Sequence, residues 1–261
     1  MTKDILVETK SGVATVTFNR PSKRNAIDHN GWLNLSHIAE ELSSKDEVKV
    51  IIFTGSVDVF SAGADIKDFS ENRYDSESAE RYAQVFEGAL DTIEAIPKPT
   101  ISKIKGYCIG GGCELSMATD IRIAADNARF AIPVAKLGIL VGYKEMRRLV
   151  QLVGPGYANY ILMTGRQLSA EFALRIGLVN EVKSMEEIDS HVEKLSTGMV
   201  PLAPLSQSRH KQILQTVLGN PGLSHLTDEE YQLPFMNFDS QDFQEGRQAF
   251  GQHRDPLFRG W

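Results

Sequence analysis

The chain has 261 residues, of which 42% are hydrophobic and 24% are charged, and its formal net charge is −6. These values are typical of a soluble globular protein with one large domain. The acidic balance argues against nucleic acid as the main partner, although a few local cations can still hold one phosphorylated small molecule. No run approaches the ~18 apolar residues of a membrane span, and the charged N-terminus does not resemble a signal peptide. We therefore expect a cytoplasmic protein with no membrane partner.

The first half of the chain alternates predicted strands with predicted helices. Two strands, over residues 5–9 and 13–18, are joined by a tight turn at Ser11-Gly12. Asp28 is placed to cap a helix that runs to about residue 42. The pattern then predicts, in order, a buried strand over 48–54, a helix over 78–96 and strands over 100–104 and 121–125.

The second half is mostly helical. A helical pattern over 145–163 is interrupted at Gly154-Pro155-Gly156, and Ser169 is placed to cap a short helix that stops at Gly177. Further helices are predicted over 185–200, 203–218 and 240–250. The two cysteines, Cys108 and Cys113, fit neither a metal site nor a redox dithiol motif, so we expect buried thiols in a reducing compartment.

Two loops of small residues each follow a predicted strand. "FSAGADIKDF" places Gly63 and Ala64 where no large side chain blocks the backbone, and "KGYCIGGGCELSMATD" places Gly111 at the start of a helix. The first N–H groups of a helix lack intrahelical partners and attract negative charge. Two such donors aimed at one carbonyl oxygen make an oxyanion hole, where one donor contributes on the order of 3 kcal/mol to a transition state. Three glycines alone are more often a packing or turn device, but the pair of loops favours a site.

Glu114 lies within the first turn of the helix that begins near Gly111. An acid at this position favours the helix dipole and needs no further role. The alternative is a proton carrier beside the oxyanion site. The spacing does not decide between the two interpretations.

Taken together, these motifs resemble the enoyl-CoA hydratase/isomerase (crotonase) superfamily. "NRPSKRNAI", "RLVQLVGPGYANYILMTGRQLSAEFALRIGLVNEV" and "QDFQEGRQAFGQHRDPLFRG" support the resemblance, which covers nearly the whole chain in the family's order. The resemblance implies an α/β fold, a spiral of strand–strand–helix turns over residues 1–200 that carries the CoA and acyl site. It implies that residues 201–261 form a helical region that covers CoA and joins homotrimers or hexamers.

The resemblance also implies a ligand, a coenzyme A thioester that is itself the substrate, with no separate cofactor. Its thioester oxygen would be held by the backbone N–H groups of Ala64 and Gly111. His253 stands where the family usually has a lysine, which leaves Arg254 as a candidate phosphate partner. The residues that the resemblance assigns to the CoA path are Lys23, Arg24, Ala26, Ala62, Ala64, Asp65, Ile66, Lys67, Gly111 and Phe250.

The chain departs from the family at the second carboxylate. Family hydratases use two glutamates; Glu114 matches the first, whereas Val134 stands in place of the second and cannot exchange a proton. Tyr143 and Glu145, in the altered segment "GILVGYKEMRRL", are candidates to supply the missing acid or to orient the substrate. The alternative for each is an exposed residue at a helix start that has no role in the site. We prefer this alternative for Glu145, and for Tyr143 we leave both interpretations open.

We therefore predict an acyl-CoA enzyme that stabilises a thioester enolate, with Glu114 as the acid/base. One carboxylate suits double-bond migration, decarboxylation or slow hydration better than fast hydration. The alternatives are an acyl-CoA decarboxylase of the methylmalonyl-CoA type and a non-catalytic acyl-CoA binder. RNA binding, known in a minor branch of the superfamily, is disfavoured by the net acidity and the absence of a Lys/Arg-rich helix.

Overall fold

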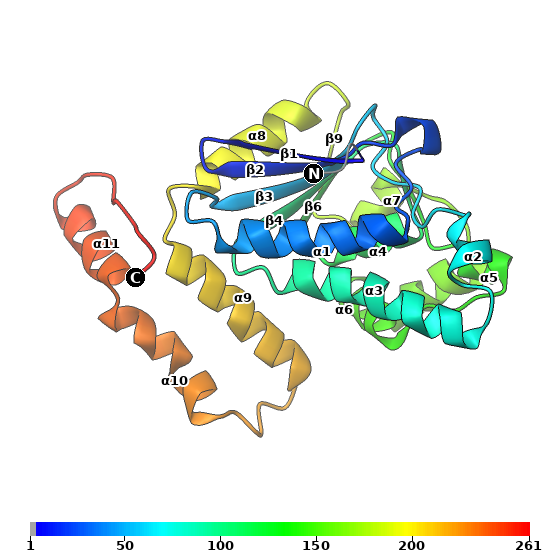
Figure 1. The fold of residues 1–261 in the computed structure, drawn as a ribbon. Helices are drawn as coiled ribbons and strands as arrows, with labels where there is room; N and C mark the ends of the chain where they lie inside the picture. Colours follow the sequence, from blue (N-terminus) through cyan, green and yellow to red (C-terminus); the bar gives the residue numbers. More distant parts are fainter. Residues whose placement is uncertain (1–3) are drawn as a thin grey trace.

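The computed structural model describes residues 4–261, which fold into a mixed α/β structure (Figure 1). The strands are β1 (Ile5–Lys10), β2 (Val13–Phe18), β3 (Val50–Gly55), β4 (Thr100–Ile104), β5 (Tyr107–Ile109), β6 (Ile121–Ala125), β7 (Arg129–Ala131), β8 (Leu168–Ser169) and β9 (Glu181–Lys183). The helices are α1 (His29–Ser44), α2 (Asp68–Glu71), α3 (Ser76–Glu94), α4 (Gly111–Met117), α5 (Val134–Leu137), α6 (Tyr143–Thr164), α7 (Ala170–Arg175), α8 (Ile188–Met199), α9 (Pro204–Gly219), α10 (Asp228–Met236) and α11 (Gln241–Gly251), with short 3-10 turns at Pro21–Lys23 and Asn237–Asp239.

The strands form two sheets. The larger has the order β1-β2-β3-β4-β6-β9, in which β1 runs antiparallel to β2 and every other neighbouring pair is parallel. The smaller has the order β5-β7-β8. A parallel bridge between Ser61 and Cys108 links the loop after β3 to β5, and a second bridge joins Ile27 to Ala64. Successive turns of the chain therefore stack, and the loops that follow β3 and β5 meet.

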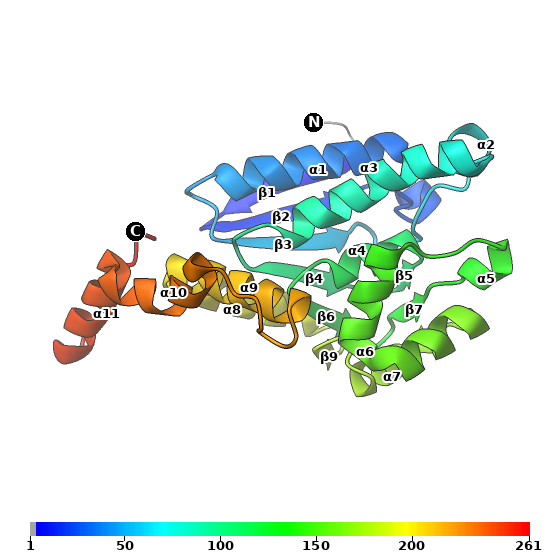
Figure 2. The same cartoon turned by 90° about the horizontal axis from the view of Figure 1, so that it is seen from below.

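The large sheet is buried on both faces, which explains the continuous apolar run of β3. Ile51 and Phe53 point into the main core, with α1 and α3 on that side, whereas Val50 and Ile52 pack in a second core with Ile188 of α8. Figure 2 shows α1 and α3 along one face of the sheet and α8 on the other. Parallel strands covered on both faces read as unbroken hydrophobic segments rather than as alternating ones.

Most predicted elements are confirmed, with shifts of a few residues at their ends. The side chain of Asp28 accepts a hydrogen bond from the amide of Gly31 at 2.9 Å and caps α1. The predicted break within α6 is present because Gly154 adopts a φ of 73°, outside the helical region. The sequence patterns missed α10, which contains Pro234, and the short strands of the smaller sheet.

The last three helices, α9, α10 and α11, lie outside the two sheets. In both views α10 and α11 lie to one side of the body, while α9 lies beside it (Figures 1 and 2). The ammonium of Lys211 on α9 donates to the carboxylate of Asp120 at 2.8 Å, which fixes α9 to the body. The division into regions 1–200 and 201–261, and the oligomeric state, stay predictions. Among residues 4–261, no helix is both long and apolar enough to cross a bilayer.

Candidate active site

The two small-residue loops touch through their backbones. Gly63 has a φ of +91°, and a Cβ atom placed on it would lie 2.5 Å from the Ile109 carbonyl oxygen and 2.9 Å from the Gly111 nitrogen. A Cβ atom on Gly111 would lie 3.5 Å from the nitrogen of Ala64. Glycine is therefore required at 63, since a side chain there would push the loops apart.

The amides of Ala64 and Gly111 are unengaged within the main chain. Among residues 4–261, neither amide donates to a backbone carbonyl outside the regular elements. Gly111 is also the first residue of α4, so its N–H has no intrahelical acceptor. Two neighbouring backbone donors are thus left for an acceptor from outside the chain.

Two aromatic side chains pack next to these amides. Atoms of Trp32 on α1 and Phe86 on α3 lie 3.1 Å and 3.4 Å from the Cβ position of Gly111. Their rings pack edge to face with centroids 4.8 Å apart, and the indole N–H of Trp32 donates to the hydroxyl of Tyr82 at 3.0 Å. Trp32 and Tyr82 are buried, whereas Phe86 is partly exposed and can contact an apolar group next to the amides.

Glu114 is buried in the first turn of α4, with 7% of its surface exposed. Burial, with a smaller contribution from the charge of Glu145, raises the pKa of its carboxyl to about 8, while Arg73 and Arg148 act in the opposite direction. A carboxyl that gains and loses its proton near neutral pH is suited to general acid–base chemistry.

The position of the second family glutamate is apolar. Val134 begins α5 and is half-buried against the main core. Tyr143, the first residue of α6, is 97% exposed. The structure does not bring the Tyr143 side chain to Glu114 within this chain, and its catalytic role stays a prediction.

The expected exposure of Glu145 is wrong, because only 3% of this residue is exposed. It occupies the third position of α6, and its carboxylate folds back over Gly142, the residue that caps the helix. Glu87 of α3 lies at the same turn, and α4 packs against α6. Periodicity along the chain does not contain this information, since α3 is far away in sequence.

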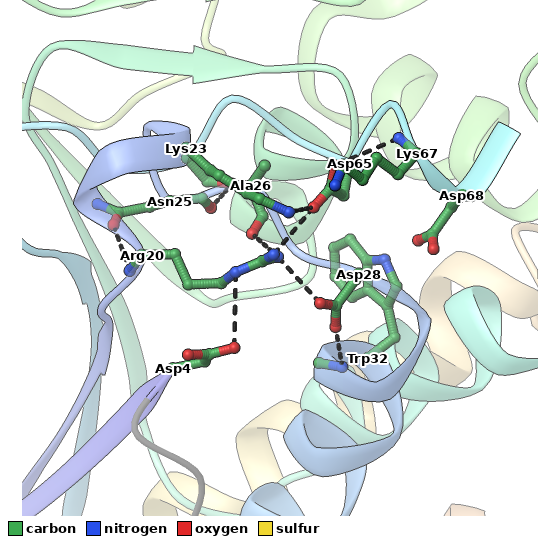
Figure 3. Close-up of polar contacts among 12 residues, drawn as sticks. Asp4, Arg20, Lys23, Asn25, Ala26, Asp28, Trp32, Asp65, Lys67 and Asp68 are labelled. Carbon is green, nitrogen blue, oxygen red and sulfur yellow. Dashed lines mark hydrogen bonds and ion pairs between the residues drawn. The ribbon is translucent and has the colours of Figure 1, made fainter.

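The predicted CoA-binding loops come together around Asp65, as Figure 3 shows. Its carboxylate accepts hydrogen bonds from Arg20 at 2.9 Å and from Lys23 at 2.5 Å. Burial raises the pKa of Asp65, but hydrogen bonds from Lys23, the Lys67 amide and Arg20 outweigh it and hold that pKa below its usual value. Arg20 was missed, because its partner Asp65 lies in a distant segment; its position directly before Pro21 in a basic turn was the one available signal.

The other predicted CoA residues differ in where they lie. The guanidinium of Arg24 is exposed and lies 5.4 Å from the ring centre of Tyr107. Ala26 is buried, Ala62 donates its amide to the Arg24 carbonyl, and Ile66 is 82% exposed. Phe250 is 85% exposed on α11, which lies on the opposite side of the molecule from α2 (Figure 1). Phe250 is therefore not brought to these loops within one chain, and its contact with CoA stays a prediction.

Comparison with known proteins gives the family. The family model described as enoyl-CoA hydratase/isomerase matches residues 8–260. The chain belongs to the enoyl-CoA hydratase/isomerase family. A crystal structure of an enoyl-CoA hydratase/carnithine racemase from Magnetospirillum magneticum has a TM-score of 0.94 and 33% identity, over 99% of this chain and 96% of that one. The observed α/β architecture is therefore the crotonase-like fold that the sequence predicts.

Curated members of the enoyl-CoA hydratase/isomerase family match over almost their full length. The crotonyl-CoA hydratase of Syntrophomonas wolfei is 35% identical over 261 residues, which covers 98% of both chains. The carnitinyl-CoA dehydratase of Escherichia coli O157:H7 is 33% identical over 264 residues and covers 100% of both chains. The family assignment implies an acyl-CoA enzyme.

Proposed function

We propose that this chain acts on enoyl-CoA esters by stabilising a thioester enolate, with Glu114 as the acid/base. One observation carries the proposal: the unengaged amides of Ala64 and Gly111 are neighbours, and Glu114 lies in the same helical turn as Gly111. Two N–H donors at a thioester oxygen favour the negative charge that develops there during the reaction. The named relatives, hydratases and dehydratases of CoA esters, support the same substrate class.

Double-bond migration is the reaction that one carboxylate serves most directly. In this step the carboxylate of Glu114 takes a proton from C2 of a 3-enoyl-CoA, and the electron pair of that C–H bond forms the C1–C2 double bond of a dienolate whose negative charge lies on the thioester oxygen. A proton is then added to C4, which gives the 2-enoyl-CoA. Hydration is expected to be slow, because Val134 cannot activate water as a second glutamate does.

A second candidate is decarboxylation of a methylmalonyl-CoA-type ester. The same amides would hold the enolate that remains after CO₂ leaves, and Glu114 would return one proton to the carbon. The observation that favours it is again Val134, since this reaction moves only one proton. A chain that binds acyl-CoA without turnover is the non-enzymatic alternative.

The test is to offer the protein crotonyl-CoA, a 3-enoyl-CoA and methylmalonyl-CoA. We expect the 3-enoyl-CoA to be isomerised fastest, and Glu114→Gln to lose about 10²–10⁴-fold in kcat while still binding the ester. Glu80→Gln, an exposed change on α3, is the control. Fast hydration of crotonyl-CoA would contradict the expectation that Val134 makes hydration slow. Tight binding of the esters without any turnover would instead support the non-catalytic acyl-CoA binder.

A further inference from the structure

Helix α3 presents a row of acids to the first turns of α6. Two of them, Asp91 and Glu94, are neutralised because the guanidinium of Arg148 lies 2.6 Å from a carboxylate oxygen of each. Arg148 itself is deeply buried, with a side chain that is 1% exposed. The third acid of the row, Glu87, faces another carboxyl group instead of an arginine.

That carboxyl group belongs to Glu145. The Oε2 atom of Glu145 and the Oε1 atom of Glu87 lie 2.4 Å and 2.7 Å from one point, the position of a Cβ atom on Gly142. Among residues 4–261, the buried Oε1 atom of Glu145 has no hydrogen-bond partner. Two carboxyl groups that share a site repel each other's negative charge, which favours retention of a proton by the more buried one.

Burial favours the protonated form of Glu145. Glu87 is the more exposed of the two, with a side chain that is 25% exposed, and the ammonium of Lys144 lies 3.8 Å from its Oε2 atom. Glu145 is 3% exposed. Burial raises the pKa of Glu145, and the charge of Glu87 adds to this, while the amides of Glu145 and Gly142 and the charge of Arg148 oppose it.

We propose that Glu145 is the second proton-carrying carboxyl group of this site, and that it supplies the proton that the enolate receives while Glu114 removes one. The inference rests on the proposed function and assigns to Glu145 the role that Val134 cannot fill. Helix α4, which carries Glu114, packs against α6, which carries Glu145, and the two carboxyl groups are close enough that a negative charge on Glu145 would raise the pKa of Glu114. The charged groups that surround the two acids are Glu87, Lys144, Arg148 and Arg73.

The proposed step balances as a pair of proton transfers. The carboxylate of Glu114 takes the C2 proton of a 3-enoyl-CoA, which leaves a dienolate with its charge on the thioester oxygen. The O–H bond of Glu145 then breaks as a C–H bond forms at C4. Glu114 then releases its proton to solvent and Glu145 takes one up from solvent, which restores both groups.

Glu145 also has a purely structural interpretation. A glutamate at the third position of a helix commonly reaches back to the amide of the capping residue, which here is Gly142. That role stabilises the helix start but does not require a proton on the carboxyl group, and it does not affect which hydrogen reaches the substrate. The two interpretations are therefore separated by label transfer and by pH dependence.

The experiment uses a 3-enoyl-CoA that carries deuterium at C2, in ordinary water. In the wild type we expect no deuterium at C4 of the product, because that hydrogen comes from Glu145. In Glu145→Gln we expect kcat to fall at least about 30-fold. The residual turnover should carry deuterium from C2 to C4, since Glu114 must then perform both transfers.

Glu87→Gln should remain active with the alkaline limb of its pH profile moved to lower pH, because the anion beside Glu145 is gone. Glu80→Gln should match the wild type.

An infrared difference spectrum between wild type and Glu145→Gln at pH 7 gives a readout that needs no turnover. We expect a protonated carboxyl band in the wild type that the variant lacks. The proposal is overturned if this band is missing, or if Glu145→Gln keeps kcat within threefold of wild type with an unchanged pH profile and label pattern. Full activity in Glu114→Gln would instead overturn the proposed function, so the two failures are distinguishable.

Discussion

Gly63 and Gly111 approach so closely that the nitrogen of Gly111 lies 2.9 Å from where a Cβ atom on Gly63 would stand. This contact joins two segments that are distant in the chain and places the amides of Ala64 and Gly111 side by side. The geometry of the candidate site therefore depends on the absence of one side chain.

Gly63→Ala should impair both stability and activity. The new methyl group would meet the Ile109 carbonyl oxygen at 2.5 Å, and the φ of +91° is a conformation that alanine adopts only under strain. We expect a loss of about 1–3 kcal/mol in the free energy of unfolding and a large fall in kcat. The matched control is Gly88→Ala in α3, where a Cβ atom meets nothing within 4 Å. Because alanine favours helices, the control should gain about 0.5–1 kcal/mol, and equal effects of the two changes would contradict the prediction. Urea unfolding measures the free energy of unfolding of each variant, and initial rates measure its kcat.

Both loops could be predicted from the sequence, because small residues after a buried strand are visible in the chain itself. Their contact could not be derived from local patterns, since it depends on the bridges Ile27–Ala64 and Ser61–Cys108, which form only when the two sheets stack. Glu145 is a second case in which local sequence patterns do not predict a tertiary contact. Its pattern is that of an exposed helix start, and its burial depends on the packing of elements that are distant in the sequence, among them α4 and Glu87 of α3.

The isomerisation rate should rise with pH as Glu114 ionises. Burial places the pKa of this carboxyl at about 8, and a general base must be ionised to accept a proton. We expect kcat/KM for a 3-enoyl-CoA to increase from pH 6 towards about pH 8 and to fall again at higher pH, where Glu145 loses the proton that it must donate. A profile that is already flat at pH 6 would show that Glu114 is not the base.

The same carboxyl group should make the fold less stable as the pH rises. The pKa of Glu114 is raised from 4.5 to about 8, so between these values the folded protein holds a proton that the unfolded chain releases. The free energy of unfolding therefore falls across this window, by on the order of 5 kcal/mol for the full shift. Glu114→Gln lacks this dependence. Urea unfolding at pH 5 and pH 8 should show a smaller difference in the variant, and equal differences would contradict the raised pKa.

Arg148 should contribute strongly to the free energy of unfolding, whereas its neighbour Arg147 should contribute little. Arg148→Met leaves Asp91 and Glu94 without the buried cation they share, and breaking a buried pair in this way costs about 3–5 kcal/mol. Arg147 also contacts Glu94, at 3.3 Å, but its side chain is 50% exposed, so Arg147→Met should cost less than about 1 kcal/mol. Because the charge of Arg148 lowers the pKa of Glu114, its removal should also move the pH–rate profile upward. Similar unfolding midpoints for both variants would refute the distinction.

Arg24 should contribute more to CoA binding than Lys23 does. The ammonium of Lys23 is already held by the carboxylate of Asp65, whereas the guanidinium of Arg24 is exposed beside the ring of Tyr107. A charge-assisted hydrogen bond contributes about 1.5–3 kcal/mol, so Arg24→Ala should raise KM for a CoA ester about 10-fold or more. The same variant should leave KM for the matching pantetheine ester unchanged, because that ester lacks the nucleotide phosphates.

Lys23→Ala should mainly affect stability, since it removes one of the two cations on Asp65 while Arg20 remains at 2.9 Å. Arg81→Ala, an exposed change on α3, controls for loss of a positive charge. If Arg24→Ala raises KM equally for the CoA and pantetheine esters, the contact is with the acyl or pantetheine part, and the assignment of Arg24 to the phosphates is wrong.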